Sequence, residues 1–320
     1  MPANKPPVFL GLDLGGTDLK YGLVSPNGRI LISKKSWAQT KEGQKGLVVQ
    51  LCEAAGELFS IASQRKLRVA RIGIGSPGAV NFGTGKVFGN CPNIPGWTGV
   101  NLKKSLGPLG VPVYADNDAN CLALAELLFG TAKNCRSVLC VTIGTGIGGG
   151  LILEGKVYRG SSFSAGEIGH TTVVFNGKKC ACGNRGCLEK YASVSALLEA
   201  ARERLKAEKE SGLKRFLEKG KVSVRGIVHA ARRKEGWAVE LIGEQAVILA
   251  AGLASAINLL NPEEVILGGG FIDAYPQFLK LVEKEIQRRA VPAALLKLKI
   301  VKAGLGNEAG LVGAAFLGNK

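Results

Sequence analysis

Hydrophobic residues at the start of the chain fall into short runs that end at glycine, proline or polar turn residues. Runs of this kind predict β-strands. Apolar residues then recur with a helical period over Gln44–Gln64. The predicted strands, the first three separated by the turns GGTD and SPNG, are Val8–Asp13, Leu19–Val24, Arg29–Ser33, Val69–Gly75 and Val111–Ala115. The chain therefore opens as a β-meander that continues into an α/β region.

The same pattern returns in the second half of the chain. A helix is predicted over Asn117–Phe129, because Asn and Asp at its amino end can cap free backbone N–H groups. Beyond it, VLCVTIGTGIGGGLILEG repeats the strand, glycine turn, strand order of VFLGLDLGGTDLKYGLV. This repeat suggests an ancestral duplication in which each copy contributes one glycine turn to a shared cleft. The remaining predicted strands are Ser137–Ile143, Leu151–Leu153, Val157–Arg159, Glu264–Leu267 and Leu298–Ala303, and the helices are Val194–Lys209, Val224–Arg233, Ala238–Leu260, Pro276–Arg289 and Glu308–Leu317.

Composition narrows the class of protein. With 320 residues, the chain is long enough for two domains of ~100–200 residues and for a core that needs no disulfides. The polar start Met1–Pro7 leads directly into a strand, so we expect no signal peptide and a cytoplasmic location. The longest apolar stretch, Ala246–Leu260, contains Ser255 and Asn258 and is shorter than the ~20 residues that span a bilayer. We therefore expect no membrane partner.

Basic residues outnumber acidic ones by 42 to 25, which gives a formal charge of +17. Nucleic acid, a membrane surface or an anionic small substrate could each account for such a charge. The densest segment, residues 200–235, is typical of a charged helix and contains Phe216 as its only aromatic residue. Because nucleic-acid sites use aromatic side chains for base stacking, the segment predicts a solvated helical face, and we expect no nucleic-acid partner.

Glycine turns that follow strands are candidates for phosphate binding, because no Cβ blocks the approach of an oxygen to the backbone N–H groups. GIGSPG, which begins at Gly73, and GTGIGG, which begins at Gly144, match the dinucleotide spacing G-x-G-x-x-G. Neither match opens a helix, as that fingerprint requires, and the Walker sequence is absent. We therefore expect phosphates to be held by hairpin turns, and we assign most of the glycine excess, Gly73 included, to ligand turns.

The sequence DLGGT places Asp13 at the end of the first strand, beside Gly15, Gly16 and Thr17. A carboxylate at this point can hold Mg²⁺ directly or through water, and the hydroxyl can meet phosphate oxygens. A turn or helix cap is the alternative for this motif taken alone. In combination with the second glycine turn and with EVILGGG, the motif predicts a nucleotide site.

Asn117, Asp118 and Asn120 lie within four residues at the end of a predicted strand. A helix cap would account for one of these side chains and would not explain why the other two are polar. A hydroxyl that accepts a phosphoryl group needs a nearby carboxylate to orient it and to take its proton. Asp118 is the candidate for that role.

Three cysteines are crowded in a polar loop, Cys180-x-Cys182-x4-Cys187, with His170 ten residues upstream of the first. Four such ligands suit tetrahedral Zn²⁺, and four protein ligands close its coordination sphere, so the predicted zinc is structural. Packed free thiols are a poor alternative in a polar loop, and a redox dithiol would favour C-x-x-C. The metal would fix the loops that carry Glu167, His170 and Glu189 toward the substrate. The other histidine, His229, is interpreted as a surface or interface residue.

Together these motifs resemble the ROK family of sugar kinases and repressors over nearly the whole chain. The motifs that carry the similarity, in chain order, are DLGGT at 13–17, GSPG at 75–78, NIPGW at 93–97, NDAN at 117–120, GTGIGGG at 144–150, GEIGH at 166–170, CACGNRGCLE at 180–189 and LNPEEVILGGG at 260–270. The resemblance implies an α/β, actin-like and ribonuclease-H-like fold whose two lobes close on ATP and a hexose. It implies a small lobe of residues 1–116 plus 305–320, and a large lobe of residues 117–304.

The resemblance also implies roles for individual residues. Asp118 would be the general base for the sugar hydroxyl, with ATP, Mg²⁺ and a structural Zn²⁺ as cofactors. Residues that bind or border the sugar would be Gly78, Asn93, Asn117, Asp118, Glu167, His170 and Glu189. Residues that bind the nucleotide would be Asp13, Gly15, Gly16, Thr17, Gly144, Thr145, Gly146, Gly148, Gly268, Gly269 and Gly270. Zinc would be held by His170, Cys180, Cys182 and Cys187.

The activity that this similarity implies is ATP-dependent phosphorylation of a hexose at its 6-hydroxyl, with glucose as the expected substrate. Fructose, mannose, N-acetylglucosamine, N-acetylmannosamine and allose are the alternative sugars, and a sugar-responsive regulator without catalysis is the alternative from another class. Repressors of the family carry a helix-turn-helix before the first phosphate turn, whereas twelve residues precede Asp13 here, which favours the enzyme. The similarity and the apolar helix 246–260 favour a homodimer or homotetramer. Asp18 departs from the lysine or asparagine common after D-x-G-G-T, and could tune magnesium binding or point away.

Overall fold

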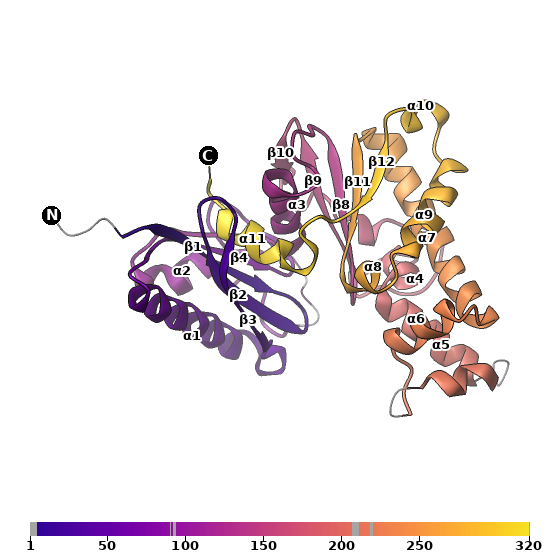
Figure 1. Cartoon of the computed structure of the whole chain (residues 1–320), viewed down its shortest axis with the longest axis horizontal. Helices are drawn as coiled ribbons and strands as arrows, with labels where there is room; N and C mark the ends of the chain where they lie inside the picture. The colour runs from indigo at the N-terminus through magenta and orange to yellow at the C-terminus, as the bar shows by residue number, and fades with distance from the viewer. Residues whose placement is uncertain (1–4, 90, 92–93, 207–210, 218–219, 320) are drawn as a thin grey trace. The chain divides into compact units, whose positions relative to one another are not determined.

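The computed structural model describes residues 5–89, 91, 94–206, 211–217 and 220–319. It divides into two compact units. The first unit contains Met1–Asn134, Gly150–Gly166 and Asn307–Lys320, and the second contains Cys135–Gly149 and Glu167–Gly306. The chain contains two five-stranded sheets (Figure 1).

The sheet of the first unit has the strand order β3-β2-β1-β4-β7. β1 pairs antiparallel with β2, and β2 with β3, as the meander predicts, whereas β1, β4 and β7 are parallel. The carboxyl ends of the three parallel strands therefore meet at one edge of the sheet. The strand bounds are β1 (Pro7–Leu14), β2 (Asp18–Val24), β3 (Ile30–Trp37), β4 (Arg68–Ser76) and β7 (Val113–Asn117).

Helices cover both faces of this sheet. α1 (Gly43–Gln64) packs Leu47, Leu51 and Leu58 into a core shared with Leu10 and Leu12 of β1. α11 (Ala309–Phe316) lies across the other face, against Gly11, Gly22 and Gly73, and packs on α3 (Asp118–Phe129). Figure 1 shows α1 and α11 on either side of the first sheet. Successive side chains of β1 point to opposite faces of the sheet, so the strand contributes to the core under α1 and to the core under α11.

The assignment of Gly73 to a ligand turn is wrong. Gly73 lies inside β4, and a Cβ there would stand 1.6 Å from the carbonyl oxygen of Ala314 in α11. A Cβ on Gly313 would stand equally close, 1.7 Å, to the carbonyl oxygen of Cys121 in α3. These glycines let two helices and a sheet pack at short range, so part of the glycine excess serves the core.

Replacing Gly73 by alanine should lower the free energy of unfolding by about 1–3 kcal/mol, because α11 must move away from β4. Gly56→Ala is the matched control, since Gly56 is exposed in α1 and nothing lies within 4 Å of the point where its Cβ would stand. There we expect a gain of about 0.5–1 kcal/mol. Urea unfolding of both variants measures the difference, and equal stabilities would contradict the packing role of Gly73.

The second sheet repeats the first in its order, β10-β9-β8-β11-β12. Its strands β8, β11 and β12 belong to the second unit, whereas β10 lies in the segment Gly150–Gly166 of the first. A meander is again followed by two strands parallel to its inner member. The predicted repetition of strand, glycine turn and strand is thus confirmed. The bounds are β8 (Val138–Ile143), β9 (Ile147–Leu153), β10 (Lys156–Tyr158), β11 (Glu264–Gly268) and β12 (Lys299–Lys302). The longer helices of the second unit are α5 (Val194–Lys206), α6 (Val224–Arg232), α7 (Gly236–Leu260) and α9 (Gln277–Gln287).

Several short elements were not predicted from the sequence. They are β5 (Ala79–Val80), β6 (Val87–Phe88), α2 (Leu102–Leu106), α4 (Glu189–Ala192), α8 (Gly270–Ala274), α10 (Pro292–Leu295) and the 3-10 turns η1 (Thr40–Glu42), η2 (Gly107–Leu109), η3 (Ile168–His170), η4 (Ser211–Phe216) and η5 (Gly306–Glu308). None exceeds six residues, which is too short for a hydrophobic period to show. The helix expected to reach Lys209 is described as far as Lys206, since residues 207–210 lie outside the described part of the chain.

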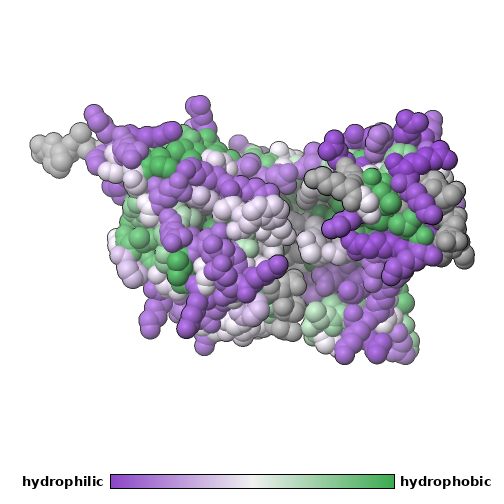
Figure 2. All heavy atoms as spheres, turned by 90° about the horizontal axis from the view of Figure 1, so that it is seen from below, coloured by the Kyte–Doolittle hydropathy of each residue, from purple (hydrophilic) through white to green (hydrophobic). Residues whose placement is uncertain are grey.

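Two helical stretches, Thr40–Gln64 and Gly236–Leu260, are long and apolar enough to cross a bilayer by length and composition alone. Both belong to cores: α7 buries Leu241, Leu249 and Leu253, as α1 buries its own leucines. Core helices pass the same test, so the finding is weak evidence for a membrane. Hydrophilic side chains cover much of the face drawn in Figure 2, between smaller hydrophobic patches.

Candidate active site

Asp13 and Asp118 lie close together at the carboxyl edge of the first sheet. Asp13 in β1 is in register with Gly75 in β4, and Gly75 with Asp116 in β7. A Cβ on Gly75 would stand 3.5 Å from Oδ1 of Asp13 and 3.6 Å from the Cα of Asp118. Asp13 and Asp118 therefore both lie within 3.6 Å of the Cβ position of Gly75 in β4.

The Asp13 carboxylate is partly buried and incompletely neutralised. Burial raises the pKa of Asp13 to about 6, the positive charge of Lys20 acts to lower it, and Glu308 raises it further. A Cβ on Gly310 would lie 2.4 Å from Oδ2 of Asp13, so the start of α11 can approach the carboxylate only as glycine. An acid held in this way favours a nearby cation, because a cation would stabilise its charged form.

The first glycine turn is closed by a hydrogen bond from the Gly15 N–H to the Asp18 carbonyl, at 2.8 Å. Gly16 and Thr17 are exposed at its tip. The side chain of Asp18 forms an ion pair with Lys35 of β3, with Oδ2 and Nζ 2.8 Å apart. The negative charge of Asp18 is therefore balanced by Lys35.

Asn117 caps α3, because its side-chain oxygen accepts hydrogen bonds from the backbone N–H groups of Ala119 and Asn120 at 2.9 and 3.3 Å. Its Nδ2 donates to the carbonyl oxygen of Gly78 at 3.1 Å, which joins two predicted sugar-site residues. Asp118 is the first residue of the helix. The predicted site residue Asn93 lies outside the described residues.

Two residues of the site, Asp116 and Arg159, belong to none of the sequence motifs. Asp116 is 1 % exposed and pairs with Arg159, whose Nε and Nη2 each lie 2.7 Å from Oδ2. Asp116 directly precedes the predicted NDAN motif, so the run Asp116–Asn120 could have been noticed as one polar group. Nothing in the local sequence marks Arg159 as its partner.

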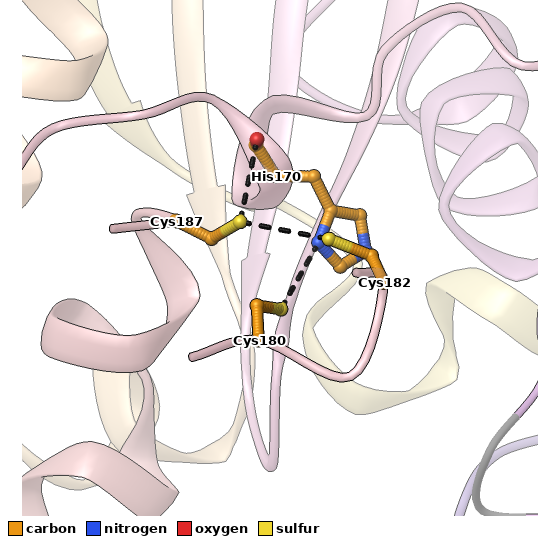
Figure 3. A group of neighbouring side chains, drawn as sticks. All are labelled: His170, Cys180, Cys182 and Cys187. Atoms are coloured by element: carbon orange, nitrogen blue, oxygen red, sulfur yellow. Dashed lines mark hydrogen bonds between the residues drawn. The ribbon is translucent and has the colours of Figure 1, made fainter. Parts of the chain in front are cut away.

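In the second unit, the four predicted metal ligands converge (Figure 3). Their ligand atoms all lie within 4.8 Å of one another, with 3.7 Å between Cys180 Sγ and His170 Nδ1 and 3.6 Å between Cys182 Sγ and Cys187 Sγ. A tetrahedral zinc ion with bonds of about 2.3 Å to sulfur and about 2.0–2.1 Å to nitrogen separates its ligands by about 3.5–3.8 Å. The geometry therefore fits a closed, four-ligand zinc site.

Two carboxylates surround His170. Glu167 Oε2 lies 4.0 Å from His170 Nε2, and Glu189 Oε1 lies 3.9 Å from Nδ1. Burial raises the pKa of Glu167, with His170 acting to lower it and Glu189 to raise it. Glu189 Oε1 also accepts a hydrogen bond from Cys180 at 3.3 Å. The structure thus gathers the predicted sugar residues of this unit beside the cysteine loop.

The second glycine turn touches the same cluster. The Gly144 N–H donates to the Gly146 carbonyl at 3.0 Å, and a Cβ on Gly146 would stand 2.7 Å from Oε2 of Glu189. The strand β9 begins at Ile147, so Gly148 lies in a strand and not in the turn as predicted. Thr145 is between the two turn glycines.

The third glycine turn follows β11, of which Gly268 is the last residue. Gly269 has a φ of +107°, and a Cβ there would stand 2.4 Å from the carbonyl oxygen of Ile143 in the neighbouring strand. Gly270 begins the short helix α8. The predicted turn is therefore present, and its sharp bend requires glycine at position 269.

Residues 9–320 match the sequence model of the ROK family. The chain belongs to the ROK family. Curated relatives named glucokinase include that of Halalkalibacterium halodurans, 32% identical over 97% of this chain and 94% of the relative, and that of Streptomyces coelicolor, 35% identical over 96% of each. The xylose repressor of Bacillus subtilis is 35% identical over 96% of this chain and 76% of its own length.

A solved structure of a ROK family glucokinase from Streptomyces griseus in complex with glucose and AMPPNP is 35% identical to this chain. The two superpose with a TM-score of 0.86 over 97% of this chain and 98% of the other. This likeness confirms the predicted two-lobed, actin-like α/β fold and the resemblance to the ROK family.

Proposed function

We propose that the chain is an ATP-dependent hexose kinase that phosphorylates glucose at its 6-hydroxyl. The observation that carries the proposal is Asp118, an acid at the carboxyl end of a parallel strand, beside the first glycine turn and Asp13. The likeness over nearly the whole chain to a glucokinase in complex with glucose and an ATP analogue supports it.

In the proposed reaction, the 6-hydroxyl oxygen of the sugar forms a bond to the γ-phosphorus of ATP as the bond from that phosphorus to the β-bridging oxygen breaks. Asp118 orients the hydroxyl and takes its proton late in a loose transition state, and ADP leaves. We assign the sugar ring to Asn117, Glu167, His170 and Glu189, with Gly78 and Asn93 at its border. We assign the phosphates and adenosine to the three glycine turns, including Gly15, Gly144 and Gly268–Gly270.

Asp13 fits a magnesium ion, because it offers a hard carboxylate oxygen whose pKa is raised to about 6 by burial. The ion, when bound, would neutralise phosphate charge. Asp13→Asn should therefore raise the Mg²⁺ concentration for half-maximal rate by at least about tenfold. Asp18→Asn is the matched control in the same turn, since Lys35 already neutralises that acid. An unchanged Mg²⁺ requirement in Asp13→Asn, measured by titration at saturating ATP, would contradict the role of Asp13.

We propose that His170, Cys180, Cys182 and Cys187 hold a structural zinc ion. Four protein ligands leave the ion no open position for substrate, so its contribution is to hold the loops of Glu167 and Glu189. His170 would donate Nδ1 to the metal, since that nitrogen lies nearer Cys180, and Nε2 would remain free to face Glu167 and the sugar.

Two functions are alternatives to glucose phosphorylation. The first is phosphorylation of another hexose. Such a kinase would use the same base and zinc loop, so it differs from a glucokinase only in the sugar that it binds. A sugar-responsive regulator is favoured by the likeness to xylose repressors, of which this chain spans about three quarters. Asp118 and both phosphate turns are intact, which supports the enzyme. A panel of these sugars at fixed ATP, followed by ADP release, tests both: no ADP with any sugar would contradict the kinase.

We further propose a cytoplasmic enzyme that works as a homodimer or homotetramer. Leu259 at the end of α7 and Leu296 after α10 are each 83 % exposed, which suits a surface that another subunit covers. We also propose that two lobes, residues 1–116 plus 305–320 and residues 117–304, close on the substrates. By its contacts α3 belongs to the first compact unit, because it packs on α11.

A further inference from the structure

We propose that Arg159, through its ion pair with Asp116, is a positioning residue for the base Asp118. The inference rests on the proposed kinase function. Arg159 follows β10 and Asp116 lies in β7, 43 residues earlier, and both belong to the first unit. Neither residue was identified from the sequence.

Asp116 forms hydrogen bonds with residues on both sides of Asp118. Its Oδ1 accepts hydrogen bonds from the Asn117 N–H at 2.8 Å and from the Asn120 side-chain amide at 2.9 Å. These two residues flank Asp118 in the strand-to-helix junction. The direction in which Asp118 leaves β7 is therefore set by a carboxylate that is 1 % exposed.

That buried carboxylate depends on Arg159. Oδ2 of Asp116 accepts two hydrogen bonds from the guanidinium, from Nε and Nη2, each at 2.7 Å. A buried carboxylate that loses its cation carries a large desolvation cost and tends to reorient or to take up a proton. Either change would release Oδ1 from the start of α3.

Arg159 is itself fixed from two further directions. Its guanidinium carbon lies 4.1 Å from the centroid of the Phe82 ring, which is stacked on Tyr114 of β7. Its Nη1 donates to the carbonyl oxygen of Val157 at 3.3 Å. Since the side chain is only 22 % exposed, the guanidinium has little freedom to leave Asp116.

An ion pair that served folding alone would change stability and leave catalysis intact once the protein is folded. A positioning role makes a different prediction. Arg159→Gln should lower kcat about 10- to 100-fold, because a shift of about 1 Å at the base has that effect, while the KM values for glucose and ATP change by less than about twofold. Added guanidinium should restore part of kcat in Arg159→Ala.

The decisive readout is the combination with Asp118→Asn. If Arg159 acts through Asp118, then Arg159→Gln should lower kcat no further once Asp118 is asparagine. Arg71→Gln is the matched control, because Arg71 also lies over an aromatic ring of the first unit, Phe9 at 3.8 Å, but donates its hydrogen bonds to the carboxyl-terminal segment, at Leu317 and Asn319. Its kcat should be that of the wild type.

Three outcomes overturn the inference: a folded Arg159→Gln with wild-type kcat, an additive effect in the Asp118→Asn background, or a fall that appears only in KM. If Arg159→Gln does not fold, Arg159→Lys can replace it. Lysine keeps the positive charge but cannot form the two parallel hydrogen bonds that the guanidinium forms with Asp116. A wild-type kcat in Arg159→Lys would also overturn the inference. A wild-type chain without kinase activity refutes the proposed function instead, so the two failures are distinguishable.

Discussion

Replacing Asp118 by asparagine should lower kcat about 10²- to 10⁴-fold, because the sugar hydroxyl loses the group that takes its proton. The variant should fold and bind glucose normally. Asn117 provides the helix cap, and the hydrogen bond from the Ala119 N–H to Asp118 Oδ1, at 2.9 Å, can be kept by an asparagine oxygen. Steady-state kinetics and glucose binding by calorimetry measure the two quantities separately.

Glu57→Gln provides the matched control for this loss of one acid in the first unit. Glu57 lies on α1 and pairs with Lys34 and Tyr21 at the surface. Its kcat should remain within about twofold of the wild type, since surface ion pairs contribute little. A kcat in Asp118→Asn close to that of the wild type would exclude Asp118 as the base.

Loss of a zinc ligand should have the second largest effect. Purified protein should contain about one zinc per chain, and Cys182→Ser should lose it. Because the metal would hold the loops around Glu167, His170 and Glu189, we expect the KM for glucose to rise at least about tenfold and the melting temperature to fall. Metal analysis, thermal unfolding and kinetics on the same preparation test all three.

Cys135→Ser is the matched control for this variant. Cys135 is a free thiol of the same unit outside the metal-binding cluster, so its replacement should change neither zinc content nor KM. Removal of zinc from the wild type with a strong chelator should reproduce the Cys182→Ser phenotype. A zinc-free wild-type protein with full activity and unchanged stability would contradict a structural zinc site.

Features encoded by neighbouring residues could be predicted from the sequence. The meander and its repeat follow from short apolar runs and turn residues, and the cysteine loop follows from spacing alone. The α/β class and the family also follow, because each motif is local and their order is specific. Asn117 at the amino end of α3 is a further case, since capping depends on the next three residues.

What the sequence could not show depends on contacts between distant segments. Arg159 and Asp116 are 43 residues apart, and no local pattern pairs them. Gly73 resembles a ligand-turn glycine in sequence, yet it is required by α11, which folds back from the carboxyl end of the chain. The glycine run GTGIGGG after a predicted strand predicts a turn that includes Gly148, whereas Gly148 lies in the strand β9.

The product of the reaction tests the proposed glucokinase activity most directly. Incubation of the wild-type chain with glucose, ATP and Mg²⁺, followed by ³¹P nuclear magnetic resonance, should show glucose 6-phosphate and ADP formed in equal amounts. The Asp118→Asn variant under the same conditions should form almost none. Phosphate on another hydroxyl, or ADP released without a sugar phosphate, would contradict a kinase that acts on the 6-hydroxyl of glucose.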